Sequence, residues 1–389
     1  MKPQVKNVAS QPAWVIRSKD IELSITQVGG HMSPVIFHRN SARPVQPYYI
    51  SPWQGEDLKI ADPVLRPLRG DFFCLPFGAG GQYKNETHYP HGEPALAKWS
   101  LKGLTQCGDV TTLTLTMNTH VRPGKVTKKL SLVDGQNVVY TSHVIEGYSD
   151  SAPLGHHATL AMPKTEGAMK ISTSPIRFGM TNPTPGGDPT KGEYPSVVAN
   201  QKFKSLDAVK LIWKDPSVGD CSSFPTRRGF VDLLAVFNQP LRHVPGWTTA
   251  VVEEEGWMWF SLKDTQVLPT TMLWVENHGR HTPPWNGRNI CLGLEDICGY
   301  FAMGIAPSCK PNALTKAGVA TAVKFSPRRP TVINYIQGVV KIPRGYVKTQ
   351  DVSFVGDKVV FTSVTGKKVA TPVNYTFIFT GNPIDDIPF

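Results

Sequence analysis

Short apolar stretches in which every second residue is polar dominate the chain, and a period of two is typical of β-strands. In residues 112–117 apolar side chains alternate with threonines, and two further apolar stretches, 126–133 and 138–145, are separated by the turn Asp134-Gly135. Strands joined by such short turns pair antiparallel with their neighbours. This part of the chain is therefore predicted to form an antiparallel meander.

The same pattern recurs on both sides of the meander. Residues 21–25 alternate in this way, and residues 251–262 and 270–275 form another predicted pair. The tail is expected to add the strands 339–342, 352–354, 359–364 and 373–379. Gly and Pro, with 34 residues each, favour many turns and few long helices. The predicted fold class is all-β, a large antiparallel β-sandwich rather than an alternating βα fold.

The whole chain, residues 1–389, is predicted to form one continuous domain. All-β folds often reach such a length as a single unit, and no linker-like segment interrupts the pattern. A small C-terminal β extension over residues 331–389 is the alternative.

The charge balance favours a solvated surface over a nucleic-acid interface. The 41 basic residues exceed the 30 acidic residues by 11, but the lysines are scattered and form no run of five or more like charges. No basic helix or aromatic RNA-binding signature occurs, so nucleic acid is not an expected partner. The basic excess leaves room for an anionic small ligand.

Cysteine spacing and hydropathy exclude several further classes. None of the six cysteines forms a C-x-x-C pair, which argues against a zinc ribbon or a thioredoxin site. No apolar run approaches 18 residues, and the first ten residues are polar, so neither a membrane span nor a signal peptide is predicted. The compartment stays open: cytoplasmic, or periplasmic or secreted if a signal peptide has been removed.

One segment, residues 272–296, concentrates groups that can carry chemistry. An apolar run ends at Trp274, and the polar, aromatic loop that follows carries Asn277 and Arg280. A second apolar run follows the loop and contains Glu295. A carboxylate near the end of an apolar strand either lowers the stability of the fold because it is buried, or takes part in binding or catalysis. Since loops of a β scaffold display binding groups, we expect a site here.

Histidines form three clusters in or near loops, namely His88-x-x-His91, His156-His157 and His278-x-x-His281. Together with Glu295 they could ligate a metal, but no H-x-H pair or other metal-ligand signature occurs, so no metal is predicted. The favoured alternative is metal-free proton transfer between a histidine and a glutamate tuned by its environment.

The order of several short motifs resembles that of the aldose 1-epimerase, or galactose mutarotase-like, superfamily. The resemblance extends over residues 20–325 and rests on Gly29-Gly30-His31, Arg69-Gly70-Asp71, His91-Gly92-Glu93 with Trp99, Gly155-His156-His157-Ala158-Thr159 and Leu292-Gly293-Leu294-Glu295. It implies the large β-sandwich of that superfamily, in agreement with the strand pattern.

The resemblance also implies roles for individual residues. Glu295 would be the general base on the anomeric hydroxyl, and His157, or alternatively His156, would protonate the ring oxygen. His91 and Arg69 would hold sugar hydroxyls. Ring opening, rotation about the first carbon–carbon bond and reclosure need only proton transfer, so no cofactor is expected.

Departures from the family pattern leave the substrate open. The strand after the histidines reads Ala158-Thr159-Leu160-Ala161 instead of an aromatic sequence, and the substrate-binding aspartate of the family has no match. The loop 274–288 is unusually rich in His, Arg and Trp, so Trp274, Asn277 and Arg280 are expected to bind substrate.

These features predict an isomerase of carbohydrate metabolism, an aldose 1-epimerase of the mutarotase type. Its expected partner is a small sugar or sugar derivative, neutral or anionic. The alternatives are a carbohydrate-binding protein without catalysis on the same scaffold, or another sugar-active lyase or isomerase.

Overall fold

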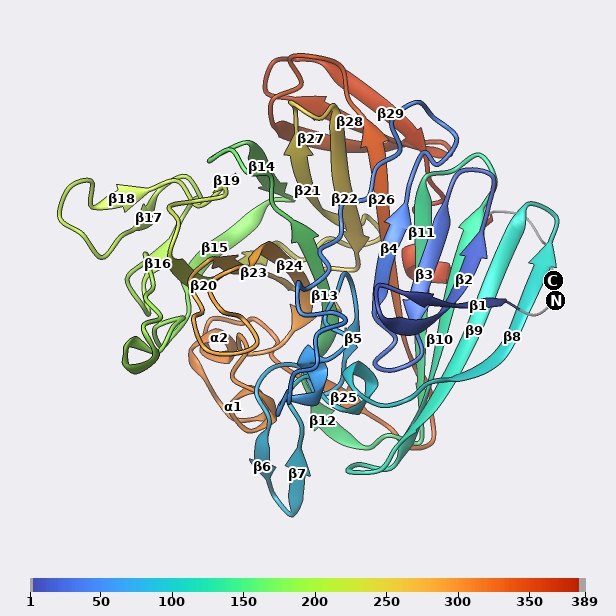
Figure 1. Ribbon diagram of the computed structural model, residues 1–389, viewed down its shortest axis with the longest axis horizontal. Helices are drawn as coiled ribbons and strands as arrows, with labels where there is room; N and C mark the ends of the chain where they lie inside the picture. The colour runs from blue at the N-terminus through green and yellow to red at the C-terminus, as the bar shows by residue number, and fades with distance from the viewer. Residues whose placement is uncertain (1–2, 385–389) are drawn as a thin grey trace.

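Two large antiparallel sheets stacked face to face form the body of the protein in the computed structural model, which describes residues 3–384 (Figure 1). The first has nine strands, in the order β19 (Ser223–Phe224), β14 (Met169–Thr173), β21 (Gly246–Val252), β22 (Trp257–Lys263), β26 (Thr331–Lys341), β11 (Val138–Glu146), β10 (Gly124–Val133), β9 (Val110–Thr119) and β8 (Ser100–Cys107). The second has seven, in the order β16 (Lys202–Phe203), β15 (Ile176–Thr181), β20 (Phe230–Asn238), β23 (Thr270–Asn277), β24 (Ile290–Cys298), β13 (Leu154–Ala161) and β5 (Phe73–Cys74). The predicted all-β sandwich is confirmed.

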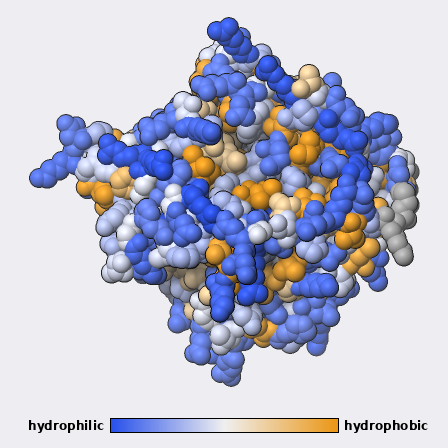
Figure 2. All heavy atoms as spheres, viewed as in Figure 1, coloured by the Kyte–Doolittle hydropathy of each residue, from blue (hydrophilic) through white to orange (hydrophobic). Residues whose placement is uncertain are grey.

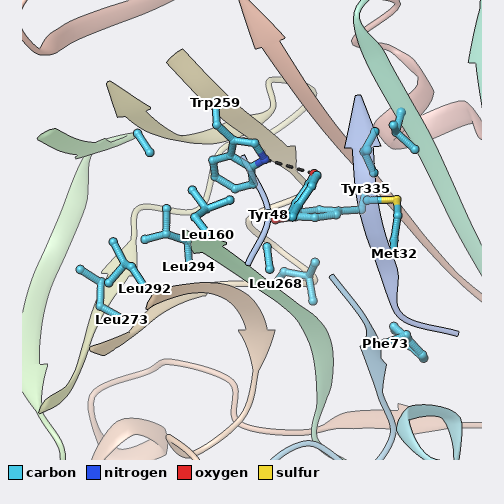
Figure 3. Close-up of a cluster of buried hydrophobic side chains, with 14 of the residues drawn as sticks. Met32, Tyr48, Phe73, Leu160, Trp259, Leu268, Leu273, Leu292, Leu294 and Tyr335 are labelled. Carbon is cyan, nitrogen blue, oxygen red and sulfur yellow. Dashed lines mark hydrogen bonds between the residues drawn. The ribbon is translucent and has the colours of Figure 1, made fainter. Parts of the chain in front are cut away.

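A four-stranded sheet lies in the same layer of the sandwich as the seven-stranded sheet. It consists of β1 (Gln4–Val8), β2 (Gln11–Arg17), β3 (Glu22–Thr26) and β4 (Met32–Ile36). Figure 1 shows it over β8–β11, beside the seven-stranded sheet. One continuous apolar cluster joins the inner faces of all three sheets. Figure 3 shows part of this cluster, in which Trp259 donates a hydrogen bond to the hydroxyl of Tyr48 at 3.2 Å.

The C-terminal part of the chain divides between two layers. β26 lies between β22 and β11 in the middle of the nine-stranded sheet, so residues 331–341 are integral to the sandwich. The sheet of β27 (Thr349–Val355), β28 (Lys358–Ser363) and β29 (Lys368–Pro372) packs on the outer face of the nine-stranded sheet, together with the helix α3 (Phe377–Thr380). The strand predicted over 373–379 is therefore wrong. Val373, Phe377 and Ile378 are buried, a spacing that suits a helical turn rather than alternation.

The remaining elements are short and lie at the margins of the sheets. Three two-stranded sheets are formed by β6 (Gly81–Tyr83) with β7 (Glu86–His88), β12 (Asp150–Ala152) with β25 (Val323–Phe325), and β17 (Val209–Lys210) with β18 (Val218–Gly219). The helical segments are α1 (Ile305–Cys309), α2 (Ala313–Lys316) and the 3-10 turns η1 (Pro63–Leu65), η2 (Glu93–Ala95) and η3 (Pro189–Lys191). Across residues 3–384, no helix is long and apolar enough to cross a membrane.

A second apolar cluster covers the outer face of the seven-stranded sheet. It joins side chains of β20, β23 and β24 to residues of the long segment 49–77 and of the stretch 301–319. Figure 2 shows a mostly hydrophilic surface on which the apolar atoms form small, separate patches. The segment 49–77 thus serves as a cover over this part of the sheet, and it provides one wall of the candidate site.

The core between the sheets contains a buried ion pair. Lys263 Nζ and Asp296 Oδ1 lie 2.6 Å apart, and both side chains are 0% exposed. Asp296 also accepts hydrogen bonds from the hydroxyls of Ser261, Thr271 and Tyr335. Burial acts to raise the pKa of Asp296, but the Lys263 charge and these hydrogen bonds outweigh it and lower the pKa.

Breaking this pair should be costly, because it leaves a buried charge uncompensated. Lys263→Met is expected to lower the free energy of unfolding by about 3–5 kcal/mol, measured by urea denaturation. Lys125→Met is the matched control, since Lys125 pairs with Glu146 at the surface and its loss should cost under about 1 kcal/mol. Equal effects of the two substitutions would contradict this account of the core.

Candidate active site

The register between β13 and β24 places two histidine–carboxylate pairs back to back. His157 lies opposite Glu295, and His156 lies opposite Asp296. Since neighbouring side chains of a strand point to opposite faces, the two pairs face opposite sides of the seven-stranded sheet. His156 and Asp296 face the inter-sheet core, whereas His157 and Glu295 face the outer cluster under the segment 49–77.

The outward pair is close and shielded from solvent. His157 Nε2 and Glu295 Oε1 are 3.2 Å apart, and the Glu295 side chain is only 1% exposed. The two atoms are near enough for an ion pair but not aligned as a hydrogen bond, so both Glu295 oxygens lack a hydrogen-bond partner within residues 3–384. A buried carboxyl group without partners is costly in a folded protein, which points to a functional role.

Burial shifts the pKa values of this pair in opposite directions. It raises the pKa of Glu295 well above the usual value. Burial, followed by the neighbouring His91, lowers the pKa of His157 well below the usual value. Because the groups are in contact, their titration belongs to the pair. The pair therefore holds one proton between the lowered pKa of His157 and the raised pKa of Glu295, and the directions of the two shifts favour its position on Glu295.

Rings on three sides fix the plane of the His157 imidazole. It stacks on Phe72 with centroids 4.5 Å apart and an interplanar angle of 18°. The rings of His91 and Trp274 meet it edge-on at 5.1 and 5.6 Å. A hydrogen bond of 3.1 Å joins its Nδ1 to Thr159 Oγ1.

The pair lines a cavity of about 290 Å³. This volume is near the lower end of small-molecule sites, which span roughly 300–1,000 Å³, and it suits one small ligand. Polar side chains on the wall are Asp62, His91, His157, Arg280 and Glu295. The rest of the wall is apolar or aromatic: Val64, Leu65, Leu68, Phe72, Pro90, Leu233, Met272, Trp274, Trp285 and Ala302.

Arg280 contacts the rings of two neighbouring tryptophans at the wall of the cavity. Its guanidinium carbon is 4.8 Å from the centre of the Trp285 ring and 5.5 Å from that of Trp274. Its Nε lies 3.5 Å from Glu276 Oε2. Burial raises the pKa of Glu276 to about 7, against the opposing charge of Arg280 and the backbone hydrogen bonds from Arg280 and Gly279. Glu276 is therefore a weak counterion, and Arg280 provides a positive charge at the cavity.

Comparison with solved structures identifies the fold. A galactose mutarotase-like protein from Clostridium acetobutylicum superposes with a TM-score of 0.59 at 12% sequence identity, covering 88% of this chain and 99% of its own. A galactose mutarotase related enzyme from Lactobacillus acidophilus gives a TM-score of 0.53 at 12% identity, covering 85% and 97% of the two chains. The chain has the galactose mutarotase-like fold. No protein-family model and no curated protein sequence matches it.

This mutarotase-like scaffold brings five of the seven predicted site residues together. His91, His157, Trp274, Arg280 and Glu295 all line the one cavity. His91 reaches it from a tight turn, in which His91 and Gly92 both have positive φ. At Gly92 a Cβ atom would lie 2.0 Å from the carbonyl oxygen of Leu75, so the His-Gly motif has a steric cause.

Arg69 lies outside this wall, which corrects its prediction as a substrate-binding residue. The side chain is fully buried. Its guanidinium donates hydrogen bonds to the carbonyl oxygens of Val8, Ala9 and Pro67 and to the side chain of Gln54. Its donors therefore fasten the cover segment to the end of β1 rather than face a ligand.

Asn277 is also outside the cavity wall. Alternation along β23 places it on the face opposite Trp274, and its side-chain amide donates a hydrogen bond to the carbonyl oxygen of Thr226 at 2.7 Å. His156, the alternative to His157, is directed into the core, where its Nδ1 bonds to Asp71 Oδ2 at 2.9 Å. Across residues 3–384, no group of three or more His, Cys, Asp or Glu side chains could hold a metal ion.

Sequence reasoning missed Asp62 and Glu276. Asp62 caps the 3-10 turn η1, accepting a hydrogen bond from the backbone of Val64, and reaches the wall from the irregular segment. No local pattern marks such a residue. For Glu276 a signal was present, because it follows Trp274 by two residues. The predicted strand 270–275 ended one residue before it, but β23 continues to Asn277, so Glu276 shares the face of Trp274.

Gly293 provides the space that Glu295 occupies. A Cβ atom at this position would lie 2.6 Å from Glu295 Oε1, closer than real Cβ contacts, and 3.1 Å from Trp274 Cβ, which is tighter than most. The glycine in the Leu-Gly-Leu-Glu motif is thus explained by the site rather than by backbone conformation.

Gly293→Ala is therefore expected to displace the Glu295 carboxyl group and lengthen its 3.2 Å approach to His157. The crystal structure of the variant would measure this separation, and the loss of unfolding free energy should stay below about 3 kcal/mol. Gly103→Ala on β8 is the control, because nothing lies within 4 Å of a Cβ atom there. An unmoved carboxyl group in the Gly293 variant would refute this role.

Proposed function

We propose that this protein is an aldose 1-epimerase that interconverts the anomers of a small sugar by opening and closing the ring. The observation that carries the proposal is the outward pair: His157 and Glu295 are buried and lie 3.2 Å apart on the wall of a cavity of ligand size. An acid and a base held side by side suit a reaction that moves protons between two oxygens on the same carbon.

Because the pKa shifts favour the uncharged pair with the proton on Glu295, the proposed reaction begins with transfer of that proton across the 3.2 Å gap to His157 Nε2, which gives a carboxylate and an imidazolium. Glu295 takes the proton of the hydroxyl on the anomeric carbon, and His157 Nε2 gives its proton to the ring oxygen. The bond between the anomeric carbon and the ring oxygen breaks, and its electron pair stays on that oxygen while a carbonyl group forms. Rotation about the adjacent carbon–carbon bond followed by the reverse transfers closes the ring with the other configuration. Proton transfer suffices, so the proposal requires no cofactor.

The walls suggest how the sugar is held. The Trp274 ring offers a flat surface for the apolar face of a sugar, while His91 and Asp62 can bond its hydroxyls. Arg280 favours an anionic substituent. Its positive charge has only the weak counterion Glu276, and no hydrogen bond from its terminal nitrogens is found between residues 3 and 384. A phosphorylated or uronic sugar is therefore the preferred substrate class, ahead of a neutral sugar.

Two-dimensional exchange NMR on neutral, phosphorylated and uronic sugars tests this function. We expect the parent protein to accelerate anomer exchange of at least one sugar, and Glu295→Gln and His157→Ala to lower the rate by about 10²- to 10⁴-fold. The parent rate should show no inflection near pH 4.5 or 6.5. The one-proton form of the pair persists from the lowered pKa of His157 up to the raised pKa of Glu295.

Glu146→Gln and His120→Ala are matched controls, because both residues are exposed. Their rates should equal that of the parent. Equal rates in the parent and the two site variants would refute the roles of Glu295 and His157. Saturable sugar binding without exchange would instead establish the carbohydrate-binding alternative.

A further inference from the structure

Thr159 is the polar neighbour of His157 on the side away from Glu295. Both residues lie on the outward face of β13, two positions apart, and a hydrogen bond of 3.1 Å joins His157 Nδ1 to Thr159 Oγ1. Backbone hydrogen bonds to Gly70 and from Tyr49 hold Thr159 from both sides, and its side chain is buried. The hydroxyl therefore has a fixed position relative to the imidazole.

Ring packing leaves His157 with one orientational choice. The stack on Phe72 and the edges of His91 and Trp274 fix the ring plane. They still permit a half-turn about the bond between Cβ and Cγ, because this rotation keeps the ring in the same plane. A half-turn would exchange ring carbon and nitrogen positions. The hydrogen bond to Thr159 is retained only in the orientation that directs Nε2 toward Glu295.

The imidazolium form of His157 has two N–H donors to satisfy. The donor on Nε2 faces Glu295 Oε1. The donor on Nδ1 needs an acceptor of its own. Thr159 Oγ1 is the side-chain partner at 3.1 Å, and the backbone of His157 itself also interacts with the ring. A hydroxyl can accept this bond without adding a negative charge, so it holds the proton on Nδ1 while leaving Nε2 free to exchange its own.

We propose that Thr159 is a positioning residue that accepts a hydrogen bond from Nδ1–H of His157 and thereby makes Nε2 the nitrogen that exchanges protons. This proposal rests on the proposed function and extends it, because Nε2 is the atom that protonates the ring oxygen there. The adjacent His156 shows the contrast: its Nδ1 bonds to the carboxylate of Asp71 in the closed core. An anionic partner stabilises the imidazolium form, whereas an uncharged hydroxyl adds no negative charge that would hold the proton on the ring.

The direct test is ¹⁵N NMR of the histidine side chains without sugar, in the parent and in Thr159→Val and Thr159→Ser. His157→Ala assigns the His157 signals by their loss. We expect Nδ1 of the parent to be protonated, with Nε2 as the exchanging nitrogen. Thr159→Val should shift the tautomer toward Nε2–H, and Thr159→Ser should restore the parent pattern. Unchanged His157 shifts in Thr159→Val would overturn the proposal.

Anomer-exchange rates provide the second readout. Loss of a hydrogen bond to a charged group should lower the rate of Thr159→Val by roughly 10- to 100-fold, with recovery in Thr159→Ser. A parent-like rate in Thr159→Val would overturn the catalytic part of the proposal. If the parent catalyses no exchange, the epimerase function fails, while the NMR comparison still decides the role of Thr159.

Discussion

The register between β13 and β24 is the constraint on which the rest of the site depends. Side chains alternate across a sheet, so a slip of one residue would move every group to the other face. The observed pairing directs His156 and Asp296 inward and His157 and Glu295 outward. A one-residue slip would place Glu295 in the core and expose Asp296 to the cavity. Leu292 and Leu294, which pack in the inter-sheet cluster, oppose such a slip because they would be removed from that cluster.

The adjacent carboxyl groups of Glu295 and Asp296 show how the surroundings differ between the two faces of the seven-stranded sheet. Asp296 has Lys263 and three hydroxyls as partners, and its pKa is lowered. Glu295 has no hydrogen-bond partner in the described chain, and its pKa is raised. Neighbours in sequence thus have pKa shifts in opposite directions because of their surroundings. The satisfied group is part of the core between the sheets, and the unsatisfied one lines the cavity.

Local patterns predicted the strands well but could not predict their neighbours. The alternation in residues 112–117 and the turn Asp134-Gly135 correspond to β9, β10 and β11 as expected. The position of β26 between β22 and β11 depends on pairing over long sequence separations, which no local signal encodes. The motif Arg69-Gly70-Asp71 suggested ligand binding, yet its charged groups fasten backbone and core, since only the fold decides which donors face a cavity. Once Glu295 was known to face outward, the alternation of side chains along β13 would have distinguished His157, which faces the same way, from His156.

The outward pair is proposed to act at the anomeric carbon, and a ligand-bound structure tests this role most directly. Glu295→Gln would be crystallised with a sugar that the parent interconverts. We expect the hydroxyl on the anomeric carbon within hydrogen-bond distance of residue 295, the ring oxygen next to His157 Nε2, and the apolar sugar face against Trp274. A sugar bound with its anomeric carbon directed away from this pair, or bound outside the cavity, would contradict the proposed role of His157 and Glu295.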